Sequence, residues 1–287
     1  MKKLVLAITL SLILTACGSG GGSSSSMEQP NFAEKEGTKV SAFFMSETLI
    51  EPHKHTHGIN TLALIPNEGK FKGKEVTVSL IPEKVKSNSV FHYIDAKDIH
   101  NSVGNALQET ESLIVSGRNY QNSRFGVFVD SEDNYFLTFT QGVVTSQNDL
   151  PKSANVTYRG NGLAMLRIEK QIVNNPEKDL YHLESGWVEG KSEFTVDFVN
   201  KKISGSLKDF KEGKNGLNIP TIIIGAKSFS NQSEYIINHM YEDKKMNKGE
   251  LLKAQFYGNK AAELSGQYAK RLDEEKVIWA VFGAKKQ

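Results

Sequence analysis

The sequence is poor in cysteine and nearly balanced in charge. Cys17 is the single cysteine in 287 residues, so no internal disulfide can staple the fold, as it does in many small secreted domains. Lysine and arginine total 35 against 33 for aspartate and glutamate, which gives a net charge of +2. A balanced chain has no global field that would attract nucleic acid or anionic lipid, and we expect no nucleic-acid partner.

Catalytic and phosphate-binding motifs are also missing from the sequence. It contains no Gly-x-Ser-x-Gly, no His-Glu-x-x-His and no phosphate-binding glycine loop. The carboxylate pairs Glu132-Asp133 and Glu274-Glu275 lie in turn-like runs that are typical of solvated surface. We therefore expect a protein that is not an enzyme and that requires no cofactor.

An apolar run stands at the start of the chain. Lys2 and Lys3 precede Leu4–Leu14, a segment too short to span a bilayer as a helix, and this order is typical of a secretory signal. The following Leu14-Thr-Ala-Cys17 has the lipobox pattern, in which small residues admit the signal peptidase and the cysteine thiol receives diacylglycerol. An ordinary signal peptide with a chance cysteine is the alternative, but Cys17 stands at the one position where lipidation needs it. We predict a signal peptide over residues 1–16 and lipidation of Cys17.

Residues 17–30 are predicted to tether the protein to a membrane. Gly18–Ser26 contains only glycine and serine, which have little to bury and much backbone entropy, so the segment should be flexible. The residue after Cys17 is not aspartate, which is compatible with transfer to the outer membrane. We expect a protein held to the outer membrane by its lipid.

The N-terminal half of the mature chain, predicted as a domain over residues 31–150, is rich in β signals. Branched and aromatic residues favour strands at 61–65, 71–81, 90–94, 113–115, 125–129 and 135–139. The last three should form a meander of neighbouring strands with a turn at Asp130–Asn134. Its aromatic residues follow strand alternation and are interpreted as core: Phe125, Phe128, Tyr135, Phe136 and Phe139. Ser102–Glu111 has the apolar spacing of a short helix, and Gln147–Pro151 is the predicted boundary.

The C-terminal half, residues 151–287, contains eight candidate strands at 155–158, 163–169, 194–199, 203–207, 221–226, 254–257, 264–269 and 277–282. Phe194, Val196 and Phe198 alternate with polar residues, as one buried face requires. Val277–Phe282 is apolar on both faces, which suggests a strand that closes a barrel. Eight strands enclose an interior that side chains fill or that holds one small ligand. Ala261–Glu263 is expected to form one helical turn, and Ser233–Lys248 a charged loop with some helix.

Short motifs in this half resemble, in order, those of a known family. They are Tyr158-Arg-Gly160, Phe194–Phe198, Asn200–Gly205, Ile222–Gly225, Phe256–Gly258, Ala261–Glu263, Gly266 and Phe282–Lys285. The set resembles the transferrin-binding-protein-B-like barrel of Slam-dependent surface lipoproteins. That resemblance implies a mainly β protein, with a C-terminal eight-stranded antiparallel barrel preceded by a β-rich, handle-like N-terminal domain. It also implies display on the cell surface and a Slam-type outer-membrane translocon as a partner.

A histidine cluster is the one candidate ligand-binding group. His53, His55 and His57 alternate along the chain, so in an extended strand they would project to one side, and neutral imidazole is a good ligand for zinc, copper or haem iron. The alternative is an exposed polar loop whose histidines bind nothing. The resembling family includes secreted haem-binding proteins, so the resemblance permits a haem site in this half.

Two further groups are candidates for contact with a partner. Trp187 lies between Gly186 and Gly190 and is either a barrel-rim residue or an exposed anchor. Arg118, Tyr120 and Arg124 occupy a loop-like stretch that could contact a partner.

The expected function is host association. In size, single lipidated cysteine and layout, the chain is similar to a host-colonisation lipoprotein of a symbiotic bacterium, which implies a host ligand that the sequence does not identify. Capture of haem or a metal by the N-terminal domain is the first alternative. The second is a module that binds a soluble host protein for immune evasion.

Overall fold

The computed structural model describes residues 40–45, 52–53, 59–64, 76–80, 90–95, 111–130, 135–171, 180–230, 237–238 and 250–287. All of them belong to one compact unit within residues 33–287. The predicted signal peptide, Cys17 and the tether lie outside the described residues, as does the helix predicted over 102–111, except for Glu111. In the part of the chain described, no helix is long and apolar enough to cross a membrane.

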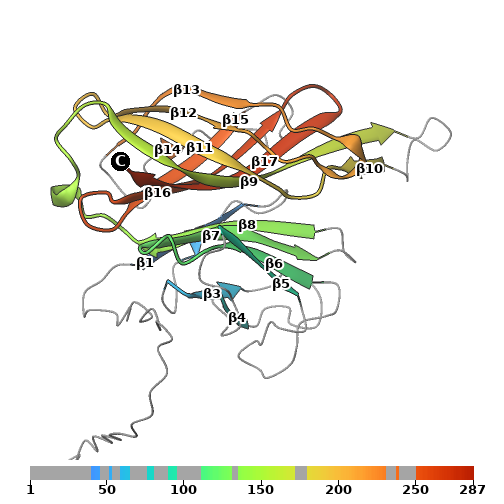
Figure 1. Ribbon diagram of the computed structural model, residues 1–287, viewed down its shortest axis with the longest axis horizontal. Helices are drawn as coiled ribbons and strands as arrows, with labels where there is room; N and C mark the ends of the chain where they lie inside the picture. The colour runs from blue at the N-terminus through green and yellow to red at the C-terminus, as the bar shows by residue number, and fades with distance from the viewer. Residues whose placement is uncertain are drawn as a thin grey trace, which may run out of the picture. The chain divides into compact units, whose positions relative to one another are not determined.

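The N-terminal half forms an antiparallel six-stranded sheet (Figure 1). Its strands, in spatial order, are β2 (Pro52–His53), β1 (Val40–Met45), β8 (Tyr135–Val143), β7 (Ser123–Asp130), β6 (Glu111–Ser116) and β5 (Phe91–Asp95). β6, β7 and β8 pair in sequence order, which confirms the predicted meander. A separate two-stranded sheet pairs β3 (Thr61–Leu64) with β4 (Val76–Ser79).

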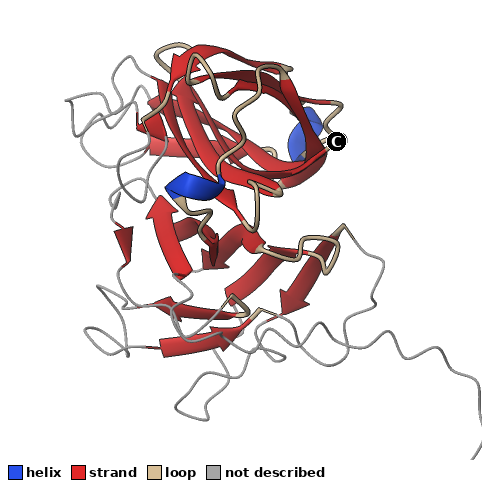
Figure 2. Ribbon diagram, turned by 90° about the vertical axis from the view of Figure 1, so that its left-hand side faces the viewer, coloured by secondary structure: helices blue, strands red, loops and turns tan. Residues whose placement is uncertain are grey.

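The C-terminal half forms an antiparallel sheet of nine strands that curls into a barrel (Figure 2). Eight of them follow one path: β13 (Ile222–Ser228), β12 (Lys202–Lys208), β11 (Val188–Asp197), β9 (Val156–Gln171), β17 (Lys276–Lys286), β16 (Glu263–Arg271), β15 (Glu250–Tyr257) and β14 (Ile237–Asn238). The ninth, β10 (Leu180–Glu184), pairs with β9 alone. The mainly β fold with a C-terminal barrel is therefore confirmed.

The two strands predicted at 155–158 and 163–169 were wrong as separate elements, because β9 runs unbroken through both. Gly160 lies inside this strand, where it makes room for a neighbour. A Cβ there would lie 2.5 Å from the Tyr120 hydroxyl and 2.7 Å from the Ala284 Cα. A glycine inside a strand commonly marks such a close approach.

The turn between β15 and β16 also differs from the sequence prediction. Gly258, Lys260 and Ala261 have φ of +75°, +51° and +53°, and Glu263 already belongs to β16. The predicted right-handed turn at Ala261–Glu263 is therefore wrong, because this connection is made in the left-handed region, where glycine is favoured. Two 3-10 helices, η2 (Gln147–Asp149) and η3 (Lys214–Gly216), occupy other connections.

Side chains fill the barrel interior. The rings of Phe194 and Phe282 stack with centroids 4.6 Å apart, and Phe256 lies 4.9 Å from Phe198 and 5.7 Å from Phe229. These rings belong to one buried apolar cluster that draws on β9, β11, β12, β13, β15, β16 and β17. Of the two interiors that eight strands permit, the described residues form the filled one, a packed apolar core.

β17 is buried on both faces, as its sequence predicts, but for a different reason. It lies in the middle of the curled sheet, between β9 and β16. Ile278 and Phe282 point into the barrel core, whereas Trp279 and Val281 belong to a second cluster that includes Phe125 of the six-stranded sheet. β17 has no solvent-exposed face because the six-stranded sheet covers the barrel there.

Candidate functional site

The junction between the six-stranded sheet and the barrel is held by a buried carboxylate. Glu263 of β16 is 3% exposed. Its two oxygens accept hydrogen bonds from the backbone N–H groups of Gln121 and Asn122, at 2.6 and 3.1 Å, and from the Ser123 hydroxyl at 2.8 Å. A buried charge is stable only when its hydrogen bonds are satisfied, so Glu263 fixes the loop before β7 on the barrel.

Tyr120 makes a second connection across the junction. Its buried hydroxyl donates to the carbonyl oxygen of Gly283, at 3.0 Å, and accepts from the backbone N–H of Asn161, at 3.1 Å. Burial raises the pKa of Tyr120 far above its ordinary value. The residue predicted from its loop-like stretch to contact a partner is instead an internal strut, because its ring is needed in the apolar core of the junction.

Arg124 is buried as well, although the same stretch suggested a surface position. Its guanidinium donates to the carbonyl oxygens of Tyr120 and Ser123. Burial lowers its pKa to about 10, against the opposing effect of the Glu263 charge. Arg118, the third residue of that prediction, is half-buried.

Three glycines of the barrel motifs, Gly160, Gly258 and Gly283, lie where the two sheets approach each other. A Cβ on Gly283 would clash with the ring of Phe125, and one on Gly258 would clash with the side chain of Asn122. The motifs that carry the family resemblance therefore include residues that make room for the N-terminal half. Gly225, by contrast, has open space where a Cβ would stand.

A recess of about 530 Å³ opens at the other end of this junction. Its volume falls in the range of ordinary ligand sites. Both halves of the chain supply its wall: Tyr93, Ser112, Ile114, Val129, Phe136, Met165, Arg167, Glu184, Ser185, Gly186, Trp187, Val188, Glu212 and Lys214. Of the described residues, this set is the candidate functional site.

The floor of the recess combines apolar side chains with an ion pair. Arg167 is 2% exposed and its Nε donates to Glu184 Oε1 at 2.5 Å. Its guanidinium carbon lies 5.4 Å from the centre of the Phe136 ring, close enough for a cation–π interaction. Phe136 in turn meets the edge of Trp187 at 5.4 Å. Trp187 is thus a half-buried rim residue, which corresponds to the first of its two predicted roles.

Tyr93 stands at the mouth of the recess. It is 60% exposed, and its hydroxyl donates to Glu189 Oε1 at 3.0 Å, while Lys211 Nζ lies 2.7 Å from the other oxygen of that carboxylate. Burial, followed by the neighbouring Glu189 charge, raises the pKa of Tyr93 well above its usual range. The hydrogen bond to Glu189 therefore holds the Tyr93 ring at the edge of the recess.

None of the three histidines of the predicted cluster is among the described residues that line the recess. His53 lies in β2, opposite Ala42 of β1, while His55 and His57 lie outside the described residues, so their role as haem or metal ligands stays a prediction. Within the described ranges, no group of three or more histidine, cysteine, aspartate or glutamate side chains could hold a metal ion.

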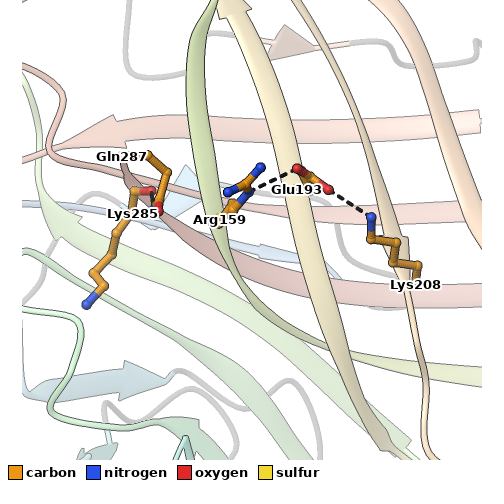
Figure 3. Close-up of polar contacts among 5 residues, drawn as sticks. All are labelled: Arg159, Glu193, Lys208, Lys285 and Gln287. Atoms are coloured by element: carbon orange, nitrogen blue, oxygen red, sulfur yellow. Dashed lines mark hydrogen bonds and ion pairs between the residues drawn. The ribbon is translucent and has the colours of Figure 1, made fainter.

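The outer face of the barrel carries charges in solvent. Figure 3 shows Glu193 of β11 between Arg159 of β9, 3.0 Å away, and Lys208 of β12, 2.8 Å away. Hydrogen bonds from these two cations lower the pKa of Glu193. Exposed pairs of this kind contribute little to stability, and we assign the group no binding role. Glu274 and Glu275 are exposed in the turn before β17, as predicted.

Sequence reasoning identified Trp187 and missed the rest of the recess. Phe136 was interpreted as core, and Met165 and Arg167 lie on a strand whose inward and outward faces are both buried. The signal that could have suggested a covered barrel face is Arg167 among Leu163–Ile168, since a charged residue there needs a buried partner.

Comparisons with known proteins identify the barrel. Residues 150–286 match the family model for the C-lobe and N-lobe beta barrels of Tf-binding protein B. An uncharacterised protein of Haemophilus influenzae is 27% identical over 93% of each chain.

Solved structures of transferrin binding protein B are also similar. The protein from Haemophilus parasuis is 22% identical, with 86% of this chain and 45% of that chain covered and a TM-score of 0.48. For the protein from serogroup B Neisseria meningitidis the identity is 22%, the coverage 86% and 43%, and the TM-score 0.49. The haemoglobin receptor HpuA of Kingella denitrificans is 9% identical, with 88% of each chain covered and a TM-score of 0.37. The chain covers less than half the length of these two transferrin binding proteins. Its residues 150–286 form a β-barrel of the transferrin-binding-protein-B type.

Proposed function

We propose that this protein is a non-enzymatic lipoprotein, anchored to the outer membrane through Cys17 and displayed on the cell surface, that binds a host macromolecule. The observation that carries the proposal is the filled interior of a transferrin-binding-protein-B-type barrel. The described side chains pack together inside the barrel, so we assign binding to the outer surfaces of the barrel and of the sheet that covers it.

The similar structures support a protein ligand. Transferrin binding protein B and the haemoglobin receptor HpuA are named for the host proteins they bind. A host protein is therefore the ligand class that we favour for this chain, in colonisation of a host or in evasion of its defences. A Slam-type translocon would deliver the chain to the cell surface.

Substitution of the lipidated cysteine tests the anchoring and display. In cells that carry the full chain, Cys17→Ser should abolish labelling by a radioactive fatty acid and release the protein from the outer-membrane fraction. The wild-type protein should be removed from intact cells by added protease, with a periplasmic protein as the protected control. A wild-type chain that resists protease until the cells are broken would contradict display on the surface.

A further inference from the structure

We propose that the recess between the six-stranded sheet and the barrel receives an aromatic or branched aliphatic side chain from the bound host protein. The inference rests on the proposed function and adds the place and chemistry of the contact. Its deepest walls include apolar side chains: Met165 is 1% exposed, and Phe136 is 4% exposed.

Charge in the recess argues against an ionic ligand. The lining residues carry two cationic groups, on Arg167 and Lys214, and two carboxylates, on Glu184 and Glu212. Arg167 and Glu184 are already paired with each other at 2.5 Å. With the charges balanced, neither an anion nor a cation gains a net attraction.

The polar groups of the floor also form their hydrogen bonds within the chain. The Ser185 hydroxyl accepts from the backbone N–H of Leu166, at 2.9 Å, and donates to the carbonyl oxygen of Gly186, at 2.8 Å. A strongly polar ligand that reached the floor would lose hydrogen bonds to water that Ser185 and the Arg167–Glu184 pair do not replace, which is costly. An uncharged apolar group loses nothing of this kind and buries its surface.

The mouth has the features of an anchor site for a protein partner. Tyr93 is the exposed aromatic residue of the rim, and Trp187 forms a half-buried wall beside it. Tyrosine and tryptophan beside a pocket that excludes water are typical of the residues that dominate binding energy at protein interfaces. Because Glu189 holds the Tyr93 hydroxyl, little side-chain freedom is lost when a partner packs against the ring.

The test uses small apolar probes that need no host protein. The mature chain without its lipid, residues 18–287, would be titrated with N-acetyl-phenylalaninamide and, separately, with the uncharged polar N-acetyl-asparaginamide. The chain has two tryptophans, so two indole N–H signals are followed by NMR. Trp187 lines the recess. Trp279 does not, but its ring lies 5.1 Å from that of Phe136 in the recess floor, so retention of the fold is checked separately by urea unfolding. We expect a saturable shift of the Trp187 signal with the phenylalanine amide and not with the asparagine amide.

Matched variants locate the binding. Ser112→Phe fills the recess and should weaken binding of the phenylalanine amide about tenfold or more, a loss of about 1.4 kcal/mol. Ser206→Phe places the same side chain on the outer face of β12, away from the recess, and should leave binding unchanged. If Ser112→Phe lowers the stability of the chain in urea unfolding, Glu212→Phe at the exposed mouth replaces it as the blocking variant.

The inference is overturned if neither amide shifts the Trp187 signal, if both shift it equally, or if the blocking variant binds as the wild type does. Each of these results leaves the proposed function standing, because capture of a host protein is measured separately. Conversely, a saturable shift of the Trp187 signal that is lost in the blocking variant supports the recess as an anchor site, even while the host protein ligand is unidentified.

Discussion

Glu263 shows, at the scale of a single residue, how a buried charge holds two sheets together. Glu263→Gln replaces one of two acceptor oxygens with a donor, which then faces N–H and O–H groups that have lost their acceptor. We expect the free energy of unfolding in urea to fall by about 1–3 kcal/mol. Glu193→Gln on the exposed barrel face is the control and should cause a smaller loss that shrinks with added salt. Equal losses in the two variants would show that the junction does not depend on this carboxylate.

Gly283 and Gly225 give a second residue-scale test, since both belong to motifs that carry the family resemblance. Gly283→Ala pushes a methyl group into the ring of Phe125, and overpacking of this kind costs about 1–3 kcal/mol. Gly225→Ala meets open space and should change the stability by about 0.5 kcal/mol or less. Thermal or urea unfolding distinguishes the two; similar effects would mean that the glycine motif does not serve the junction.

His92 makes stability depend on pH. Burial, with the nearby charges of Arg118 and Arg124, lowers its pKa from 6.5 to about 4. Between pH 6.5 and pH 4 the His92 imidazole is therefore protonated in the unfolded chain and neutral in the folded chain. The contribution of neutral His92 to stability is fully present above pH 6.5 and is lost as the pH falls toward 4, a loss of about 3 kcal/mol from this one group. Urea unfolding of His92→Gln should show a weaker loss over that interval, and an unchanged pH profile would contradict the assignment.

At the scale of elements, the order of the curled sheet predicts where the backbone is most protected. β17 and β9 pair with each other along their length and lie in the middle of the path, while β13 ends it. In hydrogen exchange followed by mass spectrometry, peptides of β17 should exchange slowest because their opening requires loss of both neighbours. Peptides of β13 should exchange faster, and equal rates would place the stable core elsewhere.

The strands that sequence reasoning found and missed differ in how much they bury. Phe194–Phe198 and Val277–Phe282 carry dense apolar patterns, and both were recognised as strands. β14 has two residues and β10 pairs with β9 alone, so neither presents the alternation that identifies a strand half-buried in a sheet. The continuity of β9 could not be predicted because Gly160 and Gly162 are residues typical of turns. In the structure, their lack of a side chain allows residues far away in the sequence to pack closely against β9.

At the scale of the whole molecule, the recess could not be predicted from the sequence. Ser112 and Trp187 are far apart in the chain, and only the packing of the six-stranded sheet on the barrel places them in one wall. The barrel itself could be predicted, because most of its strands show a buried face in their local sequence pattern. What the sequence could not show is that part of the outer barrel face is also buried, which places Tyr120 and Arg124 inside the molecule.

Capture of a host macromolecule tests the central claim most directly. The mature chain, immobilised through its N-terminus, would be exposed to host plasma and tissue extracts, and each retained protein would then be purified and titrated against the chain in solution. Haem would be titrated in parallel against the wild type and a His53→Ala, His55→Ala, His57→Ala triple variant. The account predicts saturable binding of a host protein that the triple variant retains. A chain that retains no host protein, and instead binds haem in a manner lost in the triple variant, would contradict it.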